Sequence, residues 1–245
     1  MKLPRRADRL RSLLPQAARE RLYEWHPGRA RRWQRYPGIE RIGPGGRAVL
    51  TFDDGPDEDA TPAVLDSLDQ AGVRATFFVL GSQVQAHGDL ARELVSRGHE
   101  VGLHGYRHER HDLIDPRRSG DDVRRGFSAL EESLDVRCQW YRPPYGKMSA
   151  ESARCCETLG MRLVYWSGWG LDWEDVGAGR IADVASAQVD DGSILLLHDS
   201  ARYARRASAI PTAEAIGTIV ERARERGLSF VLLRDVIPAC EGVGT

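Results

Sequence analysis

The sequence predicts an α/β fold in which a parallel sheet is covered by helices. Seven short apolar runs alternate along the chain with longer amphipathic segments, which is the order of strand–helix–strand units. The apolar runs are nearly continuous, as expected for strands that are buried on both faces. A glycine directly follows four of the amphipathic segments, at the position where helices commonly end. With 245 residues, the chain is long enough for one large α/β domain or two small ones.

The expected elements begin at residue 47, after an arginine-rich start that we interpret as an appended helix and a linker, residues 1–46. Strands are expected at the short apolar runs, which are residues 48–52, 75–80, 100–103, 139–142, 162–166, 193–197 and 229–233. Helices are expected at the longer amphipathic segments, which are residues 61–71, 83–97, 116–134, 149–159, 180–189 and 211–226. The glycines that mark helix ends are Gly72, Gly98, Gly160 and Gly227.

The composition is that of an ordinary soluble globular protein, with 41% hydrophobic and 29% charged residues and a net charge of −1. The charge is unevenly distributed, because residues 1–36 carry eleven Lys or Arg against three acidic residues, a balance of +8. Such a basic segment can contact an anionic membrane, or it can be only a solvated helical extension. Both interpretations remain open at this stage, and no nucleic-acid partner is expected.

The sequence shows no pattern of a signal peptide or a membrane span. The longest apolar stretch near the start is Leu13 and Leu14, followed by Pro15, whereas a signal peptide needs about 7–15 apolar residues. Nothing elsewhere approaches the roughly 18 apolar residues of a transmembrane helix. We therefore expect a cytoplasmic protein, or a peripheral one at the inner membrane face that uses residues 1–36 on the anionic surface.

Five short segments with polar side chains lie at the ends of expected strands. They are Thr-Phe-Asp-Asp-Gly-Pro (51–56), His-Gly-Tyr-Arg-His (104–108), Arg-Pro-Pro-Tyr-Gly (142–146), Asp-Trp (172–173) and Leu-Leu-Leu-His-Asp (195–199). In a closed barrel of parallel strands, the carboxyl ends of the strands meet at one face, where active sites are built. The five segments are therefore expected to form one site.

Two of these segments carry the side chains of a metal site. His104 and His108 are four residues apart, so on a helical turn both imidazoles would face one side. A carboxylate from Asp53 or Asp54 is the natural third ligand, and the result is a site with three protein ligands and an open position for water. An isolated histidine pair at this spacing is more often a surface feature, but the double Asp favours a metal.

The other segments supply groups for acid–base chemistry. The carboxylate that does not bind metal can act as general base, and Arg142 can pair with it and hold it ionised. The two prolines after Arg142 have no N–H, so the Tyr145 N–H is the next donor on a rigid turn and suits an oxyanion. His198 is positioned to protonate a leaving group, and Asp172 can fix its tautomer and raise its pKa.

The five segments resemble those of the NodB-type polysaccharide deacetylases, carbohydrate esterase family 4, in order and over about residues 46–238. The resemblance implies a distorted (β/α) barrel of about seven parallel strands, with residues 47–245 as the deacetylase domain. It also implies metal-dependent removal of N-acetyl groups from a GlcNAc-type saccharide that is chitin-like, peptidoglycan-like or lipid-linked. The mixed carboxylate–imidazole ligand set favours zinc, with Co2+, Ni2+ or Mn2+ as alternatives.

The same resemblance implies a role for individual residues. The implied catalytic residues are the base Asp53, Arg142 that orients it, the acid His198, Asp172 that tunes it, and Tyr145, whose N–H holds the oxyanion. The implied metal ligands are Asp54, His104 and His108. The implied substrate contacts are Pro143, Trp173 and Leu197, and the last two would line the pocket for the acetyl methyl.

Two positions depart from the family pattern, and two other functions remain as alternatives. Gly105 stands where the family usually has Ser or Thr, and Trp169 stands where it usually has Asp. The first alternative is a hydrolase of a small cyclic amide or ureide, although relatives of that kind generally alter the motif set. The second is a non-catalytic carbohydrate-binding module, although the complete set of ionisable groups speaks against a lost activity.

Overall fold

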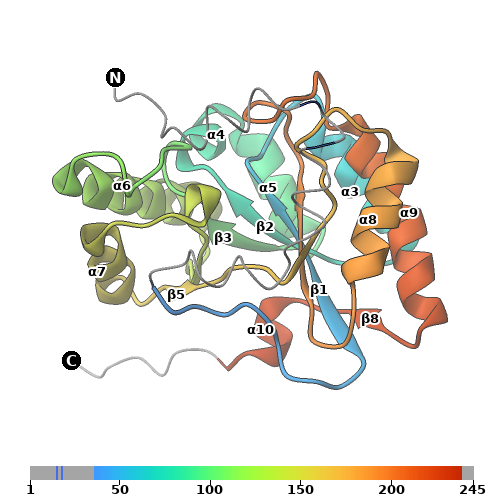
Figure 1. Ribbon diagram of the computed structural model, residues 1–245. Coiled ribbons are helices and arrows are strands. Elements are labelled where there is room, and N and C mark those ends of the chain that lie inside the picture. Colours follow the sequence, from blue (N-terminus) through green and yellow to red (C-terminus); the bar gives the residue numbers. More distant parts are fainter. Residues whose placement is uncertain (1–14, 16–17, 19–35, 239–245) are drawn as a thin grey trace.

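Parallel strands form the centre of the fold, and helices cover their outer face (Figure 1). The computed structural model describes residues 36–238 together with residues 15 and 18. The strands are β1 (Arg47–Asp53), β2 (Thr76–Val79), β3 (Glu100–Leu103), β4 (Trp140–Tyr141), β5 (Arg162–Leu163), β6 (Gly168–Trp169), β7 (Ile194–His198) and β8 (Ser229–Phe230). The helices are α3 (Thr61–Ala71), α4 (Gly81–Ala86), α5 (Gly88–Ser96), α6 (Pro116–Leu134), α7 (Ala150–Thr158), α8 (Ala178–Gln188), α9 (Ile210–Glu225) and α10 (Leu233–Val236), with a 3₁₀ turn at Pro144–Gly146.

The sheet has the order β5-β4-β3-β2-β1-β7-β6, and β8 pairs with the start of β1. All of the pairings between these strands are parallel. The sheet curls so that β5 and β6 are its two ends, which gives an incompletely closed barrel of parallel strands. This architecture confirms the α/β prediction. The register places Asp53 beside His198, so the carboxyl ends of β1 and β7 meet at the same level.

Strand β1 is buried on both faces, which explains why its sequence is a continuous apolar run. Leu50 and Phe52 point into the main core between the sheet and the helices. Val49 points the other way, into a smaller core with Phe78 and Trp140. Neighbouring side chains on a strand alternate between faces, so one strand serves both cores. Each large apolar side chain that is fully buried contributes about 1.5–3 kcal/mol to the transfer free energy.

The helices form two groups beside the sheet. Helices α3 and α8 both pack against α9 on one side, and α4 and α7 both pack against α6 on the other (Figure 1). Among the described residues, no helix is both long and apolar enough to cross a membrane.

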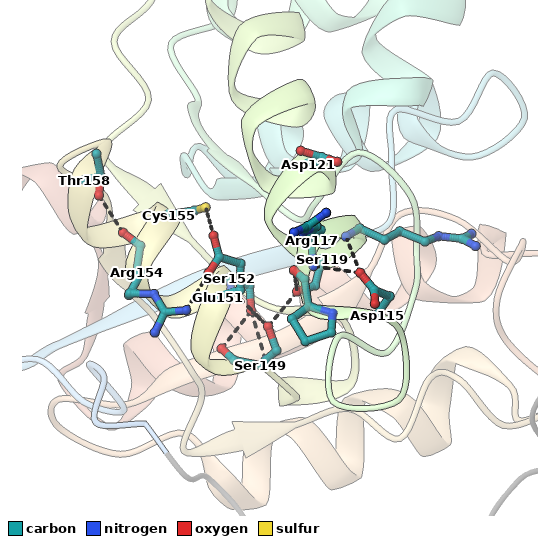
Figure 2. A network of polar contacts seen from close by, with 12 residues as sticks. Asp115, Arg117, Ser119, Asp121, Ser149, Glu151, Ser152, Arg154, Cys155 and Thr158 are labelled. Carbon is teal, nitrogen blue, oxygen red and sulfur yellow. Dashed lines mark hydrogen bonds and ion pairs between the residues drawn. The ribbon is translucent and has the colours of Figure 1, made fainter.

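Polar caps fix the junction between α6 and α7 (Figure 2). Asp115 caps α6 by accepting a hydrogen bond from Arg117 N at 2.9 Å, as Asp commonly does at this position. Ser149 caps α7 by accepting one from Ser152 N at 3.0 Å. The hydroxyls of Ser119 and Ser149 lie 2.6 Å apart and join the two helices. Because α7 follows the Pro-Pro-Tyr-Gly turn closely, this junction also helps to place that turn.

The structure corrects three of the expected elements. The helix expected at residues 83–97 is two helices, α4 and α5, because His87 has φ −127° and ψ 51° and is not helical. The strand expected at residues 162–166 ends at Leu163, and the two-residue strand β6 follows, which is too short to show a periodic pattern. The strand expected at residues 229–233 ends at Phe230, and α10 begins at Leu233. The helix expected within residues 1–46 lies almost wholly outside the described residues.

Candidate active site at the carboxyl edge of the sheet

The carboxyl ends of the central strands bring the sequence-predicted polar residues together. Asp53 is the last residue of β1, and His198 is the last residue of β7. His104 directly follows β3, and Arg142 directly follows β4. Asp53, His104 and Arg142 are each at most 3% exposed. This clustering is what the parallel arrangement of the strands requires.

Asp54, His104 and His108 form a three-residue group suited to a metal ion. One ligand atom from each residue lies within 4.8 Å of the others. Asp54 Oδ1 is 3.4 Å from His104 Nε2 and 3.3 Å from His108 Nε2. The prediction that the two histidines share a helical turn is wrong, because residues 104–110 form an irregular loop. The loop nevertheless turns both rings toward Asp54.

The residues of this group fit a divalent cation. Asp54 Oδ1 is buried and has no hydrogen-bond partner. His104 Nδ1 lies 2.7 Å from Arg142 O, so its N–H donates there and Nε2 keeps a free lone pair. Burial lowers the pKa of His108 to about 4, so this ring is a neutral ligand at pH 7. Burial alone would raise the pKa of Asp54, but the surrounding imidazoles hold it well below its usual value.

A backbone bend lets both adjacent carboxylates reach this site. Side chains of consecutive strand residues point to opposite faces. Asp54 does not follow this alternation, because its φ of +85° is outside strand geometry. The bend therefore begins at Asp54 itself, before Gly55 and Pro56. A positive φ is uncommon for a residue with a side chain and is tolerated best by Asn and Asp.

Arg142 holds Asp53 by a short, buried ion pair. Arg142 Nη1 donates to Asp53 Oδ1 at 2.7 Å, and the guanidinium is fully buried. The same guanidinium donates to Thr51 Oγ1 at 2.8 Å and to Tyr165 O at 2.9 Å, and it lies 4.0 Å from the centre of the Phe78 ring. Asp53 Oδ2 faces His104 Nε2 at 3.8 Å. Asp53 is therefore oriented by Arg142 and points one oxygen toward the metal group.

The turn after Arg142 presents Tyr145 beside the histidines. Tyr145 has φ 59° and ψ 12°, a left-handed conformation that costs a non-glycine residue roughly 1–2 kcal/mol. Its ring centre lies 4.5 Å from that of His108. Pro143 and Pro144 are buried and have no N–H, so the Tyr145 N–H is the first donor on the turn.

His198 and Asp172 form a buried pair on the other side of the site. Asp172 accepts a hydrogen bond from His198 Nδ1 at 2.9 Å and another from His198 N at 2.8 Å. Burial opposes a charge on His198, but the Asp172 carboxylate outweighs it and raises the pKa of His198 to about 9. Arg206 and Thr212, which the sequence did not single out, also contact Asp172, at 3.5 and 2.9 Å.

Two exposed tyrosines lie against His108 at the surface of the site. Tyr145 is 53% exposed and Tyr203 is 40% exposed, and no other large apolar side chain in residues 36–238 is comparably exposed. The Tyr203 ring stacks on His108 with 4.2 Å between ring centres and 23° between ring planes. Tyr203 was missed in the sequence because it lies in an irregular segment after β7 and matches no motif.

The apolar side of the site differs from the sequence prediction at one residue. Leu197 is fully buried in the main core between the sheet and the helices. Leu196, which points to the opposite face of β7, packs instead in a small cluster with Trp169, and Trp173 lies against this cluster. The Trp173 ring also meets His198 edge-on, with 5.9 Å between ring centres. Leu196 is therefore the leucine on the Trp173 side.

Asp199, the residue after His198, joins the two loops that carry the carboxylates and the histidine. Its carboxylate accepts hydrogen bonds from Gly55 N at 3.0 Å and from Thr61 Oγ1 at 2.7 Å. Ser200 Oγ donates to Asp57 Oδ2 at 2.7 Å and adds a second connection between the same loops. The sequence contained this Asp within its last motif but gave no reason to assign it a contact.

Comparisons with known proteins agree with this geometry. Residues 41–164 match the polysaccharide deacetylase family. The sequence is 30% identical over 82% of the chain to a peptidoglycan-N-acetylglucosamine deacetylase of Listeria monocytogenes, and the chain spans 41% of that relative's length. It is 38% identical to a chitooligosaccharide deacetylase of Sinorhizobium fredii over 66% of this chain and 76% of the relative. A family 4 carbohydrate esterase from Streptomyces lividans, solved with acetate, has a TM-score of 0.68 and 27% identity over 77% of this chain and 93% of that one.

Proposed function

The chain belongs to the polysaccharide deacetylase family, and from this premise we propose that it is a metal-dependent hydrolase that removes N-acetyl groups from GlcNAc-containing saccharides. The observation that carries the proposal is the meeting of three groups at one edge of the sheet. These are the group Asp54, His104 and His108, the pair Asp53–Arg142 and the pair His198–Asp172. A site that only bound saccharide would not need all of these buried ionisable groups.

Asp54, His104 and His108 would hold a divalent ion, with zinc preferred and Co2+, Ni2+ or Mn2+ as alternatives. When bound, such an ion supplies positive charge that polarises the acetyl carbonyl and acidifies water. The protein's own contribution at this point is the ligand geometry. His104 is held by the carbonyl of Arg142, and Asp54 keeps one oxygen free of hydrogen bonds.

Asp53 takes the proton from the attacking water in this proposal. The water oxygen forms a bond to the acetyl carbon, and the Asp53 carboxylate accepts the proton that is released. Arg142 supports this role because its guanidinium binds Asp53 Oδ1 at 2.7 Å and favours the ionised carboxylate. The Tyr145 N–H holds the oxygen of the acetyl group as negative charge develops on it.

His198 donates the proton that the leaving amine needs. The C–N bond breaks, acetate leaves, and the sugar nitrogen receives the proton from His198 Nε2. Asp172 accepts the hydrogen bond from His198 Nδ1, which leaves the Nε2 proton directed away from Asp172. A pKa raised to about 9 keeps His198 protonated at pH 7, as an acid requires.

The rim of the site supports a saccharide as substrate. Tyr145 and Tyr203 are exposed aromatic side chains beside His108, and an amphipathic aromatic ring suits contact with a sugar ring. The acetyl methyl would lie near Trp173 and Leu196, with Pro143 on the turn beside the oxyanion donor. Leu197 would support the site only indirectly, through its packing in the main core.

We also propose that residues 1–36, which lie almost wholly outside the described residues, contact an anionic membrane from the cytoplasmic side. Their +8 charge supports this, because a cationic residue near an anionic leaflet contributes about 1 kcal/mol. The test is co-sedimentation with phosphatidylserine vesicles for the full chain and for a variant without residues 1–36. The full chain is expected to sediment at low salt only, and equal sedimentation of both proteins would contradict the proposal.

The activity itself is tested by acetate release. N-acetylchitooligosaccharides, peptidoglycan fragments and lipid-linked GlcNAc precursors would be incubated with the protein before and after treatment with a chelator. Acetate from at least one saccharide, lost on chelation and restored by zinc, is the expected result. Hydrolysis of a cyclic amide or ureide without acetate release would favour the first alternative. Saccharide binding without any hydrolysis would favour a binding module.

A further inference from the structure

The loop that carries His104 and His108 has no regular secondary structure, so its backbone groups must find other partners. Its carbonyl groups are bound by the start of α4. Gly81 N donates to Gly105 O at 2.9 Å, and Ser82 N donates to Tyr106 O at 3.0 Å. These two hydrogen bonds give partners to carbonyl groups of the loop but not to its N–H groups.

Two N–H groups in the middle of the same loop, those of Tyr106 and Arg107, are bound by one side chain, Asp122 from the second turn of α6. Asp122 Oδ2 accepts a hydrogen bond from Tyr106 N at 2.9 Å, and Oδ1 accepts one from Arg107 N at 3.0 Å. The carboxylate is buried, with 7% of the residue exposed. Hydrogen bonds to an ionised carboxylate are stronger than those between neutral groups.

Asp122 is itself held by two further buried side chains, His111 and Tyr141. His111 Nε2 lies 3.2 Å from Asp122 Oδ2, and Tyr141 OH lies 3.3 Å from His111 Nδ1. The consistent assignment is that Tyr141 donates to His111 Nδ1 and that His111 donates to Asp122. His111 and Tyr141 are both fully buried. A buried polar network of this kind restricts the orientation of each of its members.

Gly105 lies directly against this carboxylate. Its φ is +93°, and a Cβ built there would lie 2.8 Å from Asp122 Oδ2 and 3.1 Å from Arg107 O. Helix α6 also approaches the loop closely at Gly126, where a Cβ would lie 2.9 Å from Tyr106 N. A side chain at position 105 and the present position of Asp122 are therefore incompatible.

We propose that Asp122 is the positioning residue of the metal site, and that it occupies the space beside the loop that a side chain at position 105 would need. The inference rests on the proposed metal site. Asp122 touches neither metal ligand directly, but it fixes the two peptide N–H groups between them. The spacing and direction of His104 and His108 then depend on Asp122, and Gly105 is the residue that leaves room for it.

The experiment measures zinc affinity by competition with a chromophoric chelator, together with thermal unfolding of the metal-free protein. Asp122→Ala is expected to weaken zinc binding by about 10–100-fold, the usual effect of losing a group that orients metal ligands. Asp122→Asn keeps one acceptor oxygen but turns an amide N–H toward the other backbone N–H, so an intermediate loss is expected. Asp121→Ala is the matched control, because Asp121 is the neighbouring acid on α6, is exposed, and pairs with Arg124.

Gly105→Ser tests the second half of the inference. The single variant is expected to lose zinc affinity, because the new side chain meets Asp122. In Gly105→Ser/Asp122→Ala that clash is absent, so the combined loss is expected to be smaller than the product of the two single losses. Losses that multiply would mean that the two residues act independently, and they would overturn the pairing.

The outcomes separate this inference from the proposed function. If the wild-type protein binds no zinc, the metal site and this inference both fail. If the wild type binds zinc and Asp122→Ala binds it equally well, only this inference fails. An Asp122→Asn protein that unfolds at lower temperature but keeps wild-type zinc affinity would also overturn it, because Asp122 would then only stabilise the fold.

Discussion

At the scale of single residues, Asp53 and Asp54 are neighbours in the chain with different surroundings. Asp53 has a guanidinium on one oxygen, whereas Asp54 has imidazole nitrogens near an oxygen that accepts no hydrogen bond. The first environment suits a base that must stay ionised and oriented, and the second suits a metal ligand. The contacts of the two residues therefore support the different roles proposed for them.

This difference predicts distinct effects of two isosteric variants. Asp53→Asn is expected to reduce acetate release by at least about 10²-fold, the lower end of the usual contribution of a positioned base, with zinc content retained. Asp54→Asn is expected to lose both zinc and activity. The measurements are acetate release and metal content after dialysis. Near-normal activity of Asp53→Asn, or full zinc content of Asp54→Asn, would show that the two roles are assigned wrongly.

The His198–Asp172 pair predicts a pH effect. The pKa of His198 is raised to about 9, so its acid function is present below this pH and is lost as the pH rises through it. Asp172→Asn removes the carboxylate that raises this pKa. The alkaline limb of the kcat profile is therefore expected to move toward the ordinary histidine value of about 6.5. Asp183→Asn is the control, because Asp183 is an exposed acid that pairs with Arg222. Profiles of Asp172→Asn and wild type that overlay would remove Asp172 from the mechanism.

At the scale of elements, the segment between β7 and α9 contributes side chains to the site as well as connecting the two elements. Its buried Arg206 binds His198 O at 3.1 Å and lies 3.5 Å from Asp172, while its Tyr203 lies on His108 at the surface. One irregular segment thus contacts both the proposed acid and a proposed metal ligand. Active sites are often built on such segments, which a rigid sheet holds in place.

The exposed face of Tyr203 predicts an effect that depends on substrate length. Tyr203→Ala is expected to raise KM for a tetra- or pentasaccharide by several-fold, because a sugar ring loses its stacking surface, with kcat little changed. For a monosaccharide substrate both constants are expected to stay near wild type. Tyr203→Phe keeps the ring and serves as the control. A loss of zinc affinity in Tyr203→Ala would indicate instead that the ring supports His108.

The sequence predicted the bounds of several elements to within one residue, and the short strand β3 (Glu100–Leu103) is one of them. The helices at residues 61–71 and 116–134 have the predicted bounds, and β1 differs by one residue at each end. The motif residues also meet at one edge, because that follows from their positions at the ends of parallel strands. Contacts between residues that are distant in the sequence could not be predicted from such patterns. Asp122 lies 11 residues from His111, and Arg206 and Thr212 lie 34 and 40 residues from Asp172, and no periodicity connects such positions.

Leu196 and Leu197 show why a motif alone does not identify which of its residues lines the site. Both leucines belong to the same motif, and both are at most 5% exposed. They differ only in the face of β7 to which they point, and a run of four apolar residues buried on both sides does not reveal that face. The packing of Leu196 with Trp169 settles it.

At the scale of the whole molecule, the proposed metal group joins parts of the chain that are far apart in sequence. Asp54 follows β1, while His104 and His108 follow β3, and β2 lies between these two strands in the sheet. A ligand that binds only the folded state stabilises it by RT ln(1 + [L]/Kd). An ion bound across two loops should therefore be visible as a change in global unfolding, independently of any activity.

Zinc at 100 times its Kd is expected to stabilise the fold by about 2.7 kcal/mol. For a domain of roughly 150–250 residues, each kcal/mol raises Tm by about 2–4 °C, so the total rise is about 5–11 °C.

His104→Ala removes one ligand and is expected to abolish most of this rise, whereas His99→Ala serves as the control. His99 is also a buried histidine, but it lies at the other end of β3, where its Nδ1 accepts a hydrogen bond from Ala75 N at 3.2 Å. The measurement is thermal unfolding followed by circular dichroism, with each variant compared with and without zinc. The control is expected to lose Tm in both conditions and to keep the zinc-dependent difference. A rise in His104→Ala equal to that of the wild type would place the stabilising ion elsewhere in the molecule.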